Sequence, residues 1–345
     1  MRPETKKNSD AEPQKKLAEP PQVIKAVYAT SWSAGTPSRI NYLTDLIKTT
    51  ELNAIVIDIK DYSGNVTYNT EVEEVKKYGA REIRIPRINS LIKKLHEDNI
   101  YVIGRVTVFQ DPILAAARPD LAIKNKTTGK IWTDRKGLGW IDPGSKEYWD
   151  YIVKIAKDAE ARGIDEINFD YIRFPSDGDL SEMVYQFYDE KKERKEDVIA
   201  EFFRYLRFNL KDEKISADLF GLATIQKDDL GIGQVIESAY ASFDYVSPMV
   251  YPSHYAAGFL GYKNPTNFPY EVVKYSMEKA EEKFLATGLT TSKLRPWLQD
   301  FDLGANYGPT EVKAQFKALA DAGVENGWML WDPSNVYTKE ALILN

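Results

Sequence analysis

The most constraining feature of the chain is an alternation of short apolar runs with amphipathic stretches. The runs are rich in Val, Ile, Phe, Tyr or Trp, as buried strands are, and occupy residues 23–32, 54–60, 100–108, 165–174, 214–221, 244–252, 294–301 and 327–332. The stretches between them carry apolar residues at helical spacing, for example Ile88, Leu91, Ile92 and Leu95. Strand–helix alternation repeated to eight strands predicts a closed parallel (β/α)8 TIM barrel.

The connections differ in length at the two ends of the predicted barrel. Helix-to-strand connections are short, whereas several strand-to-helix connections are long, at about 61–86, 109–144, 175–192 and 253–269. Long βα loops on one side predict that the functional face lies at the C-terminal ends of the strands. No linker is visible after residue 22, so residues 23–345 are interpreted as one domain.

Residues 1–22 differ in composition from the rest of the chain. They are almost all charged, polar or Pro, and such a segment buries too little apolar surface to offset the loss of chain entropy. We therefore predict a disordered polar tail. It lacks the apolar run of a signal peptide, so it is interpreted either as a ragged terminus or as a tether that holds an exported domain at a surface.

Composition limits the chemistry that the chain can perform. Its 345 residues include no Cys and two His, His96 and His254. Thiol nucleophiles and Cys-ligated zinc are excluded, and a Ser-His-Asp triad would need one of these two histidines. A formal net charge of −6 argues against nucleic acid as a partner, and no apolar run approaches the length of a membrane span. We expect a monomer without cofactor or metal, in which carboxylates perform any catalysis.

Strand alternation selects the candidate carboxylates. Successive side chains of a strand point to opposite faces, and the helix-facing sets are apolar, so several polar residues point into the barrel near C-terminal strand ends: Asp58, Lys60, Arg105, Asp170 and Asp218, with Asp332 where the last strand ends. Buried charges are costly unless they are paired or functional. The set therefore indicates a catalytic site, and a structural ion-pair network, for instance Arg105 with Asp170, is the alternative.

Two carboxylates at a barrel mouth suit glycoside hydrolysis, in which one protonates the leaving oxygen and the other attacks the anomeric carbon or activates water. Aromatic residues near the strand ends would stack on sugar rings, although barrel packing explains such residues equally well. The candidate substrate-binding residues at this end are Asp58, Arg105, Arg173, Tyr251, His254, Trp297, Gln299, Asp300, Trp331 and Asp332. The stretch 176–179 could hold a calcium ion, but a plain turn explains it as well.

Several motifs extend this interpretation over nearly the whole folded part: AIVIDIKDYSG (54–64), GIDEINFDYIRFPSDG (163–178), DYVSPMVYPSHY (244–255) and LWDPSNVY (330–337). Together they resemble a glycoside hydrolase family with a TIM-barrel fold, long known only as a domain of unknown function and distantly related to the α-amylase group. The resemblance implies hydrolysis of glycosidic bonds in a polysaccharide of a cell envelope or of the extracellular space. It also implies an extracellular or cell-surface location.

The resemblance also assigns roles to individual residues. Barrels like α-amylase keep a nucleophile on the fourth strand, where this chain has Asp170, and an acid/base on the fifth, where it has Asp218. The related pattern has Glu at the second place, and because Asp reaches less far, Asp58, Asp300 and Asp332 stay as alternatives for that role. Two other functions remain open: a non-catalytic carbohydrate-binding barrel, and a metal-assisted hydrolase or lyase.

Overall fold

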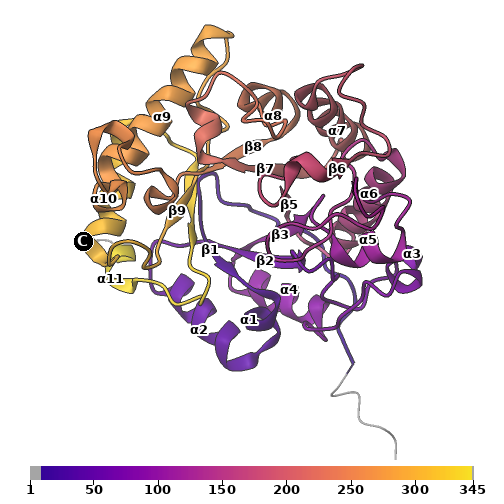
Figure 1. The fold of residues 1–345 in the computed structure, drawn as a ribbon. Helices are drawn as coiled ribbons and strands as arrows, with labels where there is room; N and C mark the ends of the chain where they lie inside the picture. Colours follow the sequence, from indigo (N-terminus) through magenta and orange to yellow (C-terminus); the bar gives the residue numbers. More distant parts are fainter. Residues whose placement is uncertain (1–8, 344–345) are drawn as a thin grey trace, which may run out of the picture.

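The computed structural model describes residues 9–343, and its central feature is a closed barrel of eight parallel strands (Figure 1). The strands, in their order around the barrel, are β1 (Ile24–Ala29), β2 (Ala54–Lys60), β3 (Tyr101–Thr107), β5 (Glu166–Asp170), β7 (Lys214–Phe220), β8 (Tyr245–Met249), β9 (Trp297–Gln299) and β10 (Gly327–Trp331). β10 pairs with β1 and closes the circle. The predicted (β/α)8 barrel is confirmed, and each strand falls within its predicted run.

Helices surround the barrel (Figure 1). They are α1 (Ser31–Gly35), α2 (Pro37–Lys48), α3 (Glu73–Lys77), α4 (Ile88–Glu97), α5 (Pro112–Ala117), α6 (Lys146–Glu160), α7 (Lys195–Asn209), α8 (Ile236–Ser242), α9 (Pro269–Ala286), α10 (Pro309–Asp321) and α11 (Lys339–Leu342). The core divides accordingly. Ile55, Ile57 and Ile59 of β2 belong to the cluster between strands and helices, whereas Val56 belongs to the cluster inside the barrel. Among residues 9–343, no helix is long and apolar enough to span a membrane.

Lys60 corrects the expected parity of β2. The pairing of β2 with β3 shifts register between Asp58 and Lys60, and such an irregularity redirects the following side chain. The Lys60 ammonium group therefore points away from the barrel mouth. It forms an ion pair with Asp111 (3.0 Å) and donates a hydrogen bond to the carbonyl oxygen of Thr107 (2.9 Å). Lys60 thus fixes the start of the loop after β3.

The loops after β3 and β5 are joined above the barrel. The short strands β4 (Lys124–Asn125) and β6 (Met183–Val184) form an antiparallel pair between them. The buried carboxylate of Asp142 accepts hydrogen bonds from the backbone N–H groups of Gln186 (2.6 Å) and Phe187 (2.7 Å). These contacts hold the loop after β5 in place, and that loop forms part of the cavity described below.

Residues 9–22 lie against the N-terminal end of the barrel, in contrast to the disorder predicted for residues 1–22. The backbone N–H of Leu17 donates to Asp165 (2.6 Å), and that of Gln14 donates to the carbonyl oxygen of Arg162 (3.1 Å). The Leu17 side chain packs against the cluster inside the barrel. Composition could not reveal these contacts, because the segment is ordered by partners supplied from elsewhere. The rest of the predicted tail, residues 1–8, lies outside the described residues.

Asp10 supplies a cap to α4 from outside the helix. Its carboxylate accepts hydrogen bonds from the backbone N–H groups of Asn89 (3.1 Å) and Ser90 (2.8 Å), and Arg87, at the N-cap position, makes no side-chain cap. We expect Asp10→Ala to lower the free energy of unfolding by about 1 kcal/mol, measured by thermal or urea denaturation. Asp10→Asn keeps the acceptor and serves as the control. An Asp10→Ala variant as stable as the parent would contradict this role.

Candidate active site

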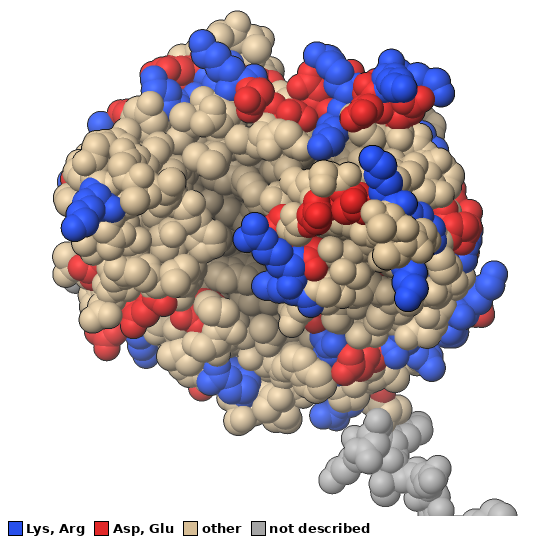
Figure 2. Space-filling view, viewed as in Figure 1, with Lys and Arg blue, Asp and Glu red and all other residues tan. Residues whose placement is uncertain are grey.

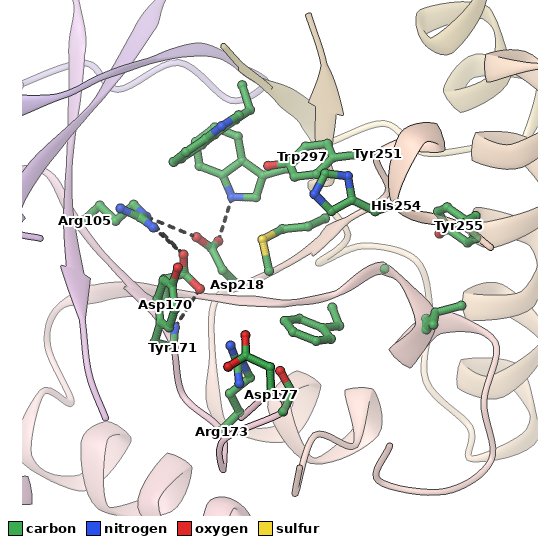
Figure 3. Close-up of a pocket in the computed structure, with 16 residues that line it drawn as sticks. Arg105, Asp170, Tyr171, Arg173, Asp177, Asp218, Tyr251, His254, Tyr255 and Trp297 are labelled. Atoms are coloured by element: carbon green, nitrogen blue, oxygen red, sulfur yellow. Dashed lines mark hydrogen bonds and ion pairs between the residues drawn. The ribbon is translucent and has the colours of Figure 1, made fainter. Parts of the chain in front are cut away.

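A cavity of about 480 Å³ opens at the C-terminal ends of the strands, within the size range of small-molecule sites. Figure 2 shows a hollow in the middle of this face, and Figure 3 shows the side chains around the cavity. Eight of the twelve candidate residues from the sequence line it: Arg105, Asp170, Arg173, Asp218, Tyr251, His254, Trp297 and Trp331. The other four lie elsewhere and are described below.

Register brings Asp170 and Asp218 to the same level of the barrel. The neighbouring strands β5 and β7 pair Asn168 with Ser216. Because side chains alternate along a strand, Asp170 and Asp218, two residues further on, also point inward and lie side by side. Figure 3 shows the two carboxylates on the same wall of the cavity.

Asp170 is held by a guanidinium group and by the backbone. Its Oδ2 accepts hydrogen bonds from Arg105 Nη2 (2.5 Å) and Nε (3.2 Å), and its Oδ1 accepts one from the backbone N–H of Tyr171 (2.6 Å). The positive φ of Tyr171, 53°, turns the chain sharply where β5 ends. The carboxylate is therefore fixed in one orientation, and it still lines the cavity.

Asp218 is more deeply buried than Asp170 and has different hydrogen-bond partners. Its Oδ1 accepts hydrogen bonds from Asn168 Nδ2 (2.8 Å) and Trp297 Nε1 (2.8 Å). Burial, followed by the neighbouring charge of Asp170, raises the pKa of Asp218 well above the usual range of a carboxyl group. Asp218 therefore retains its proton to a higher pH than an ordinary aspartate.

The shared arginine limits the separation of the two carboxylates. Arg105 Nε lies 3.2 Å from Asp170 Oδ2 and 3.9 Å from Asp218 Oδ2, so these two oxygens are no farther apart than the sum of the two distances. That upper bound of about 7 Å joins one oxygen of each carboxylate; it is compatible with the separation of about 5–5.5 Å in retaining glycosidases and with the lower end of the range of about 6.5–9.5 Å in inverting ones.

Asp58 positions Arg105 and is not part of the cavity wall. Its Oδ1 accepts a hydrogen bond from Arg105 Nη1 (2.6 Å), and its Oδ2 accepts one from the Tyr28 hydroxyl (2.5 Å). The Tyr28 ring stacks on Trp331, with 3.9 Å between the ring centroids, and Trp331 also lies against the Arg105 guanidinium. The ion-pair network considered from the sequence is thus present, and it holds Asp170 at the cavity.

Gln299, Asp300 and Asp332 lie outside the cavity wall and stabilise the loops that follow β8 and β10. Gln299 accepts a hydrogen bond from the backbone N–H of Ser253 (3.1 Å), and Asp332 accepts one from that of Ser334 (2.6 Å). Asp300 accepts hydrogen bonds from the backbone N–H (2.9 Å) and hydroxyl (2.6 Å) of Thr338, and burial raises its pKa to about 7. Asp300 follows Gln299 directly, so it points away from the barrel interior.

His254 and Tyr251 form the rim of the cavity after β8. Their rings meet edge to face at 5.3 Å, and His254 Nδ1 shares a hydrogen bond with the Ser253 hydroxyl (3.0 Å). Partial burial lowers the pKa of His254, so the imidazole is neutral at pH 7. His96 lies far from this rim, on α4, where it contacts Asp165 (2.9 Å).

Several wall residues were absent from the sequence-based set, mostly because they lie in the loops that follow the strands. They are Tyr171, Ser176, Asp177, Phe220, Gly221, Leu222, Met249 and Tyr255. Alternation along β7 would have selected Phe220, which follows Asp218 by two residues. The loop residues have no such periodicity. The stretch 176–179 ends in a turn in which Asp179 accepts a hydrogen bond from the N–H of Ser181 (3.2 Å); among residues 9–343, no group of three or more His, Asp or Glu is placed to hold a metal ion.

Comparisons with known proteins agree with this geometry. A sequence model of the family described as "Putative glycosyl hydrolase domain" matches residues 26–337. A hypothetical protein from Ruminiclostridium thermocellum is 36% identical over 59% of this chain and 98% of its own, with a TM-score of 0.52. The PgaB (BpsB) glycoside hydrolase domain from Bordetella bronchiseptica covers 94% of this chain and 99% of its own at 13% identity, with a TM-score of 0.66.

A third similar structure is the spore cortex-lytic enzyme SleL from Bacillus cereus, 10% identical over 93% of this chain and 73% of its own, with a TM-score of 0.55. At these identities the last two structures show a shared fold. The comparison with curated protein sequences gives no match.

Proposed function

This chain belongs to the glycosyl hydrolase domain family whose model covers it, and from this premise we propose that Asp170 and Asp218 cleave the glycosidic bonds of a polysaccharide. The observation that carries the proposal is the pair itself. Two carboxyl groups on adjacent strands face one cavity and share Arg105, while their surroundings differ. Different surroundings for two nearby acids are what an acid and a nucleophile need.

In the proposed reaction, Asp218 is the acid. Its raised pKa keeps a proton available for the glycosidic oxygen of the leaving sugar. Asp170, which forms an ion pair with Arg105, attacks the anomeric carbon as that bond breaks, and a covalent glycosyl-enzyme forms. Asp218, now deprotonated, then takes a proton from water, and the water oxygen displaces Asp170 with net retention of configuration.

The aromatic wall supports a saccharide as the ligand. Trp297 and Trp331 line the cavity and meet edge to face, with 5.6 Å between their ring centroids. Tyr251 and Tyr255 add further ring surface to the wall. Such rings bind the apolar faces of sugars while their polar atoms anchor the rings in the protein. We further propose that the chain acts outside the cell or at its surface, which the likeness to a spore cortex-lytic enzyme supports.

Incubation with a panel of polysaccharides tests this function, with new reducing ends and products followed by mass spectrometry. Cleavage of one of them is the expected result. The alternative, a carbohydrate-binding barrel, predicts binding on a glycan array without product from any bound glycan, because such a barrel keeps the aromatic wall and lacks a competent acid.

The pH dependence of kcat/KM offers a finer test of the acid. Asp218 must be protonated, so activity is expected to persist well above the ordinary pKa of a carboxyl group and to fall when Asp218 loses its proton. The Trp297 N–H stabilises the Asp218 carboxylate and thereby lowers its pKa. Trp297→Phe removes that hydrogen bond, so the alkaline limb of the profile is expected to move to higher pH.

Trp331→Phe is the matched control for this change. Trp331 also lines the cavity, but within the described residues it makes no hydrogen bond to Asp218. This variant is expected to weaken substrate binding without moving the alkaline limb. An identical shift in both variants, or a limb that Trp297→Phe leaves in place, would rule out Asp218 as the acid.

A further inference from the structure

Arg173 is a buried cation on the cavity wall, three residues beyond Asp170. The residue has 8% relative exposure. Three aromatic rings surround the guanidinium carbon, which lies 4.7 Å from the Phe220 centroid, 4.9 Å from Trp140 and 5.3 Å from Tyr171. These rings remove water from the guanidinium group and attract it weakly, but they supply no full negative charge.

Arg173 also differs from the other buried cations of the described chain. Five Lys or Arg residues are buried there, and four of them form ion pairs: Lys60 with Asp111, Arg105 with Asp58 and Asp170, Arg162 with Asp158, and Arg295 with Glu166. Arg173 has no such partner within residues 9–343, and its one hydrogen bond there runs from Nη1 to the carbonyl oxygen of Phe174 (3.0 Å). Because a buried charge without a partner is costly, this arrangement points to a ligand.

Two exposed cations, Arg135 and Lys136, lie next to the part of the cavity wall that carries Arg173. Asp177 is on the same wall as Arg173 (Figure 3) and accepts a hydrogen bond from the backbone N–H of Arg135 (3.3 Å). Arg135 and the next residue, Lys136, are exposed, and within the described residues neither forms an ion pair. Figure 2 shows Lys and Arg side chains at one edge of the hollow, opposite a wall of uncharged residues. Exposed cations at a cleft raise the local concentration of anions.

We propose that Arg173 binds an acidic group of the saccharide, so that the substrate of this site is an anionic polysaccharide. The guanidinium group presents parallel N–H donors that match the two oxygens of a carboxylate, or those of a sulfate or phosphate ester. The Phe174 carbonyl and the three rings hold this group in one orientation. The inference rests on the proposed function, because Arg173 shares its cavity with Asp170 and Asp218.

Binding of the full chain to a glycan array that contains uronic-acid, sulfated, phosphorylated and neutral glycans tests the inference. The unmodified protein is expected to bind acidic glycans at least about tenfold more tightly than neutral ones, since a hydrogen bond to a charged group contributes that much. Arg173→Met is expected to lose this preference, and Arg173→Lys to keep part of it. Binding to uronic-acid glycans alone, or to sulfate or phosphate esters alone, identifies which oxyanion the site takes.

Chemical reduction of the carboxylates of a bound uronic-acid glycan to alcohols completes the comparison. The unmodified protein should bind the reduced glycan as weakly as the Arg173→Met variant binds the unreduced one. The Arg173→Met variant should bind the reduced and unreduced glycans equally. Arg194→Met removes the same charge from the exposed start of α7, outside the cavity wall, and should bind acidic glycans normally. Arg173→Gln, with thermal unfolding as a check, replaces Arg173→Met if the latter fails to fold.

The outcomes separate this inference from the proposed function. A preference of the unmodified protein for neutral glycans, or equal binding of acidic glycans by Arg173→Met, would overturn the subsite even if hydrolysis occurs. Acidic glycans that bind through Arg173 but yield no product by mass spectrometry would support the subsite and contradict hydrolysis.

Discussion

Replacing Asp170 with Asn is expected to reduce kcat for glycoside hydrolysis by about 10⁴-fold or more, the effect of removing a nucleophile from a cooperating catalytic group. The amide is a poor nucleophile, so the glycosyl-enzyme cannot form. Its carbonyl oxygen can still accept the hydrogen bonds from Arg105, although its NH2 group cannot accept the one from the Tyr171 N–H, and Arg105 keeps its ion pair with Asp58. We therefore expect the melting temperature to stay within a few degrees of the parent's, and product release to be followed by reducing-end assay or mass spectrometry.

Asp300→Asn is the matched control for Asp170→Asn. Asp300 was another candidate from the sequence, is also buried, and sits outside the cavity wall in hydrogen bonds to Thr338. The control is expected to lose stability at most and to keep kcat near that of the parent. Full activity of Asp170→Asn, or equal losses in both variants, would show that Asp170 is not the nucleophile.

Replacing Asp218 with Asn is expected to reduce kcat by about 10²–10⁴-fold, the usual contribution of a positioned general acid. The size of the loss should depend on the leaving group. Aryl glycosides with acidic phenols need little protonation, so their cleavage should fall far less than that of a natural polysaccharide. The Asn oxygen can accept the hydrogen bonds from Asn168 and Trp297, and no buried acid has to ionise, so the variant should be at least as stable as the parent.

Rescue of the Asp218→Asn variant by azide, a small anionic nucleophile, is the second test of the role of Asp218. Once an activated substrate has glycosylated Asp170 in the Asp218→Asn variant, azide can attack the anomeric carbon without a general base and should restore turnover, with a glycosyl azide as product. Equal losses for natural and activated substrates, with no rescue by azide, would remove Asp218 from the role of acid/base.

The fold could be predicted because it follows from patterns within short stretches of the sequence. Alternation of apolar side chains along β2 separates Ile55, Ile57 and Ile59 from Asp58 without any knowledge of their neighbours, and loop lengths then identify the functional end. Lys60 was misplaced because a register shift depends on how β2 pairs with β3. The order of residues 9–22 was missed for a similar reason, since partners such as Asn89 and Ser90 are remote in sequence.

The centre of the candidate site followed from the same alternation, and its periphery did not. Asp170, Asp218, Arg105 and Trp297 lie on strands, where parity determines direction. Asp300 and Asp332 follow strand ends, where a carboxylate can equally well stabilise a loop: Asp332 closes a turn at Ser334, and Asp300 binds Thr338 in the loop after β10. The wall residues of the loop after β5, such as Ser176 and Asp177, depend on contacts with the loop after β3 that no sequence period records.

Arg105 connects the structural and the catalytic interpretations of the buried charges. It pairs with Asp58 and Asp170 and reaches towards Asp218, so one cation offsets the cost of placing three carboxyl groups in the barrel. Because Asp170 receives two hydrogen bonds from Arg105 while Asp218 receives none, the same arginine also gives the two acids different surroundings. The ion-pair network of Arg105, which was considered as an alternative to a catalytic site, therefore contributes to the different surroundings of Asp170 and Asp218.

The most direct test of this account is to trap the glycosyl-enzyme. The Asp218→Asn variant, incubated with an activated glycoside that it cleaves, should accumulate a covalent adduct, because the second step lacks its base. Proteolysis and tandem mass spectrometry are predicted to place one added glycosyl group on Asp170. An adduct on another carboxylate, or product of inverted configuration formed without any adduct, would contradict the central claim.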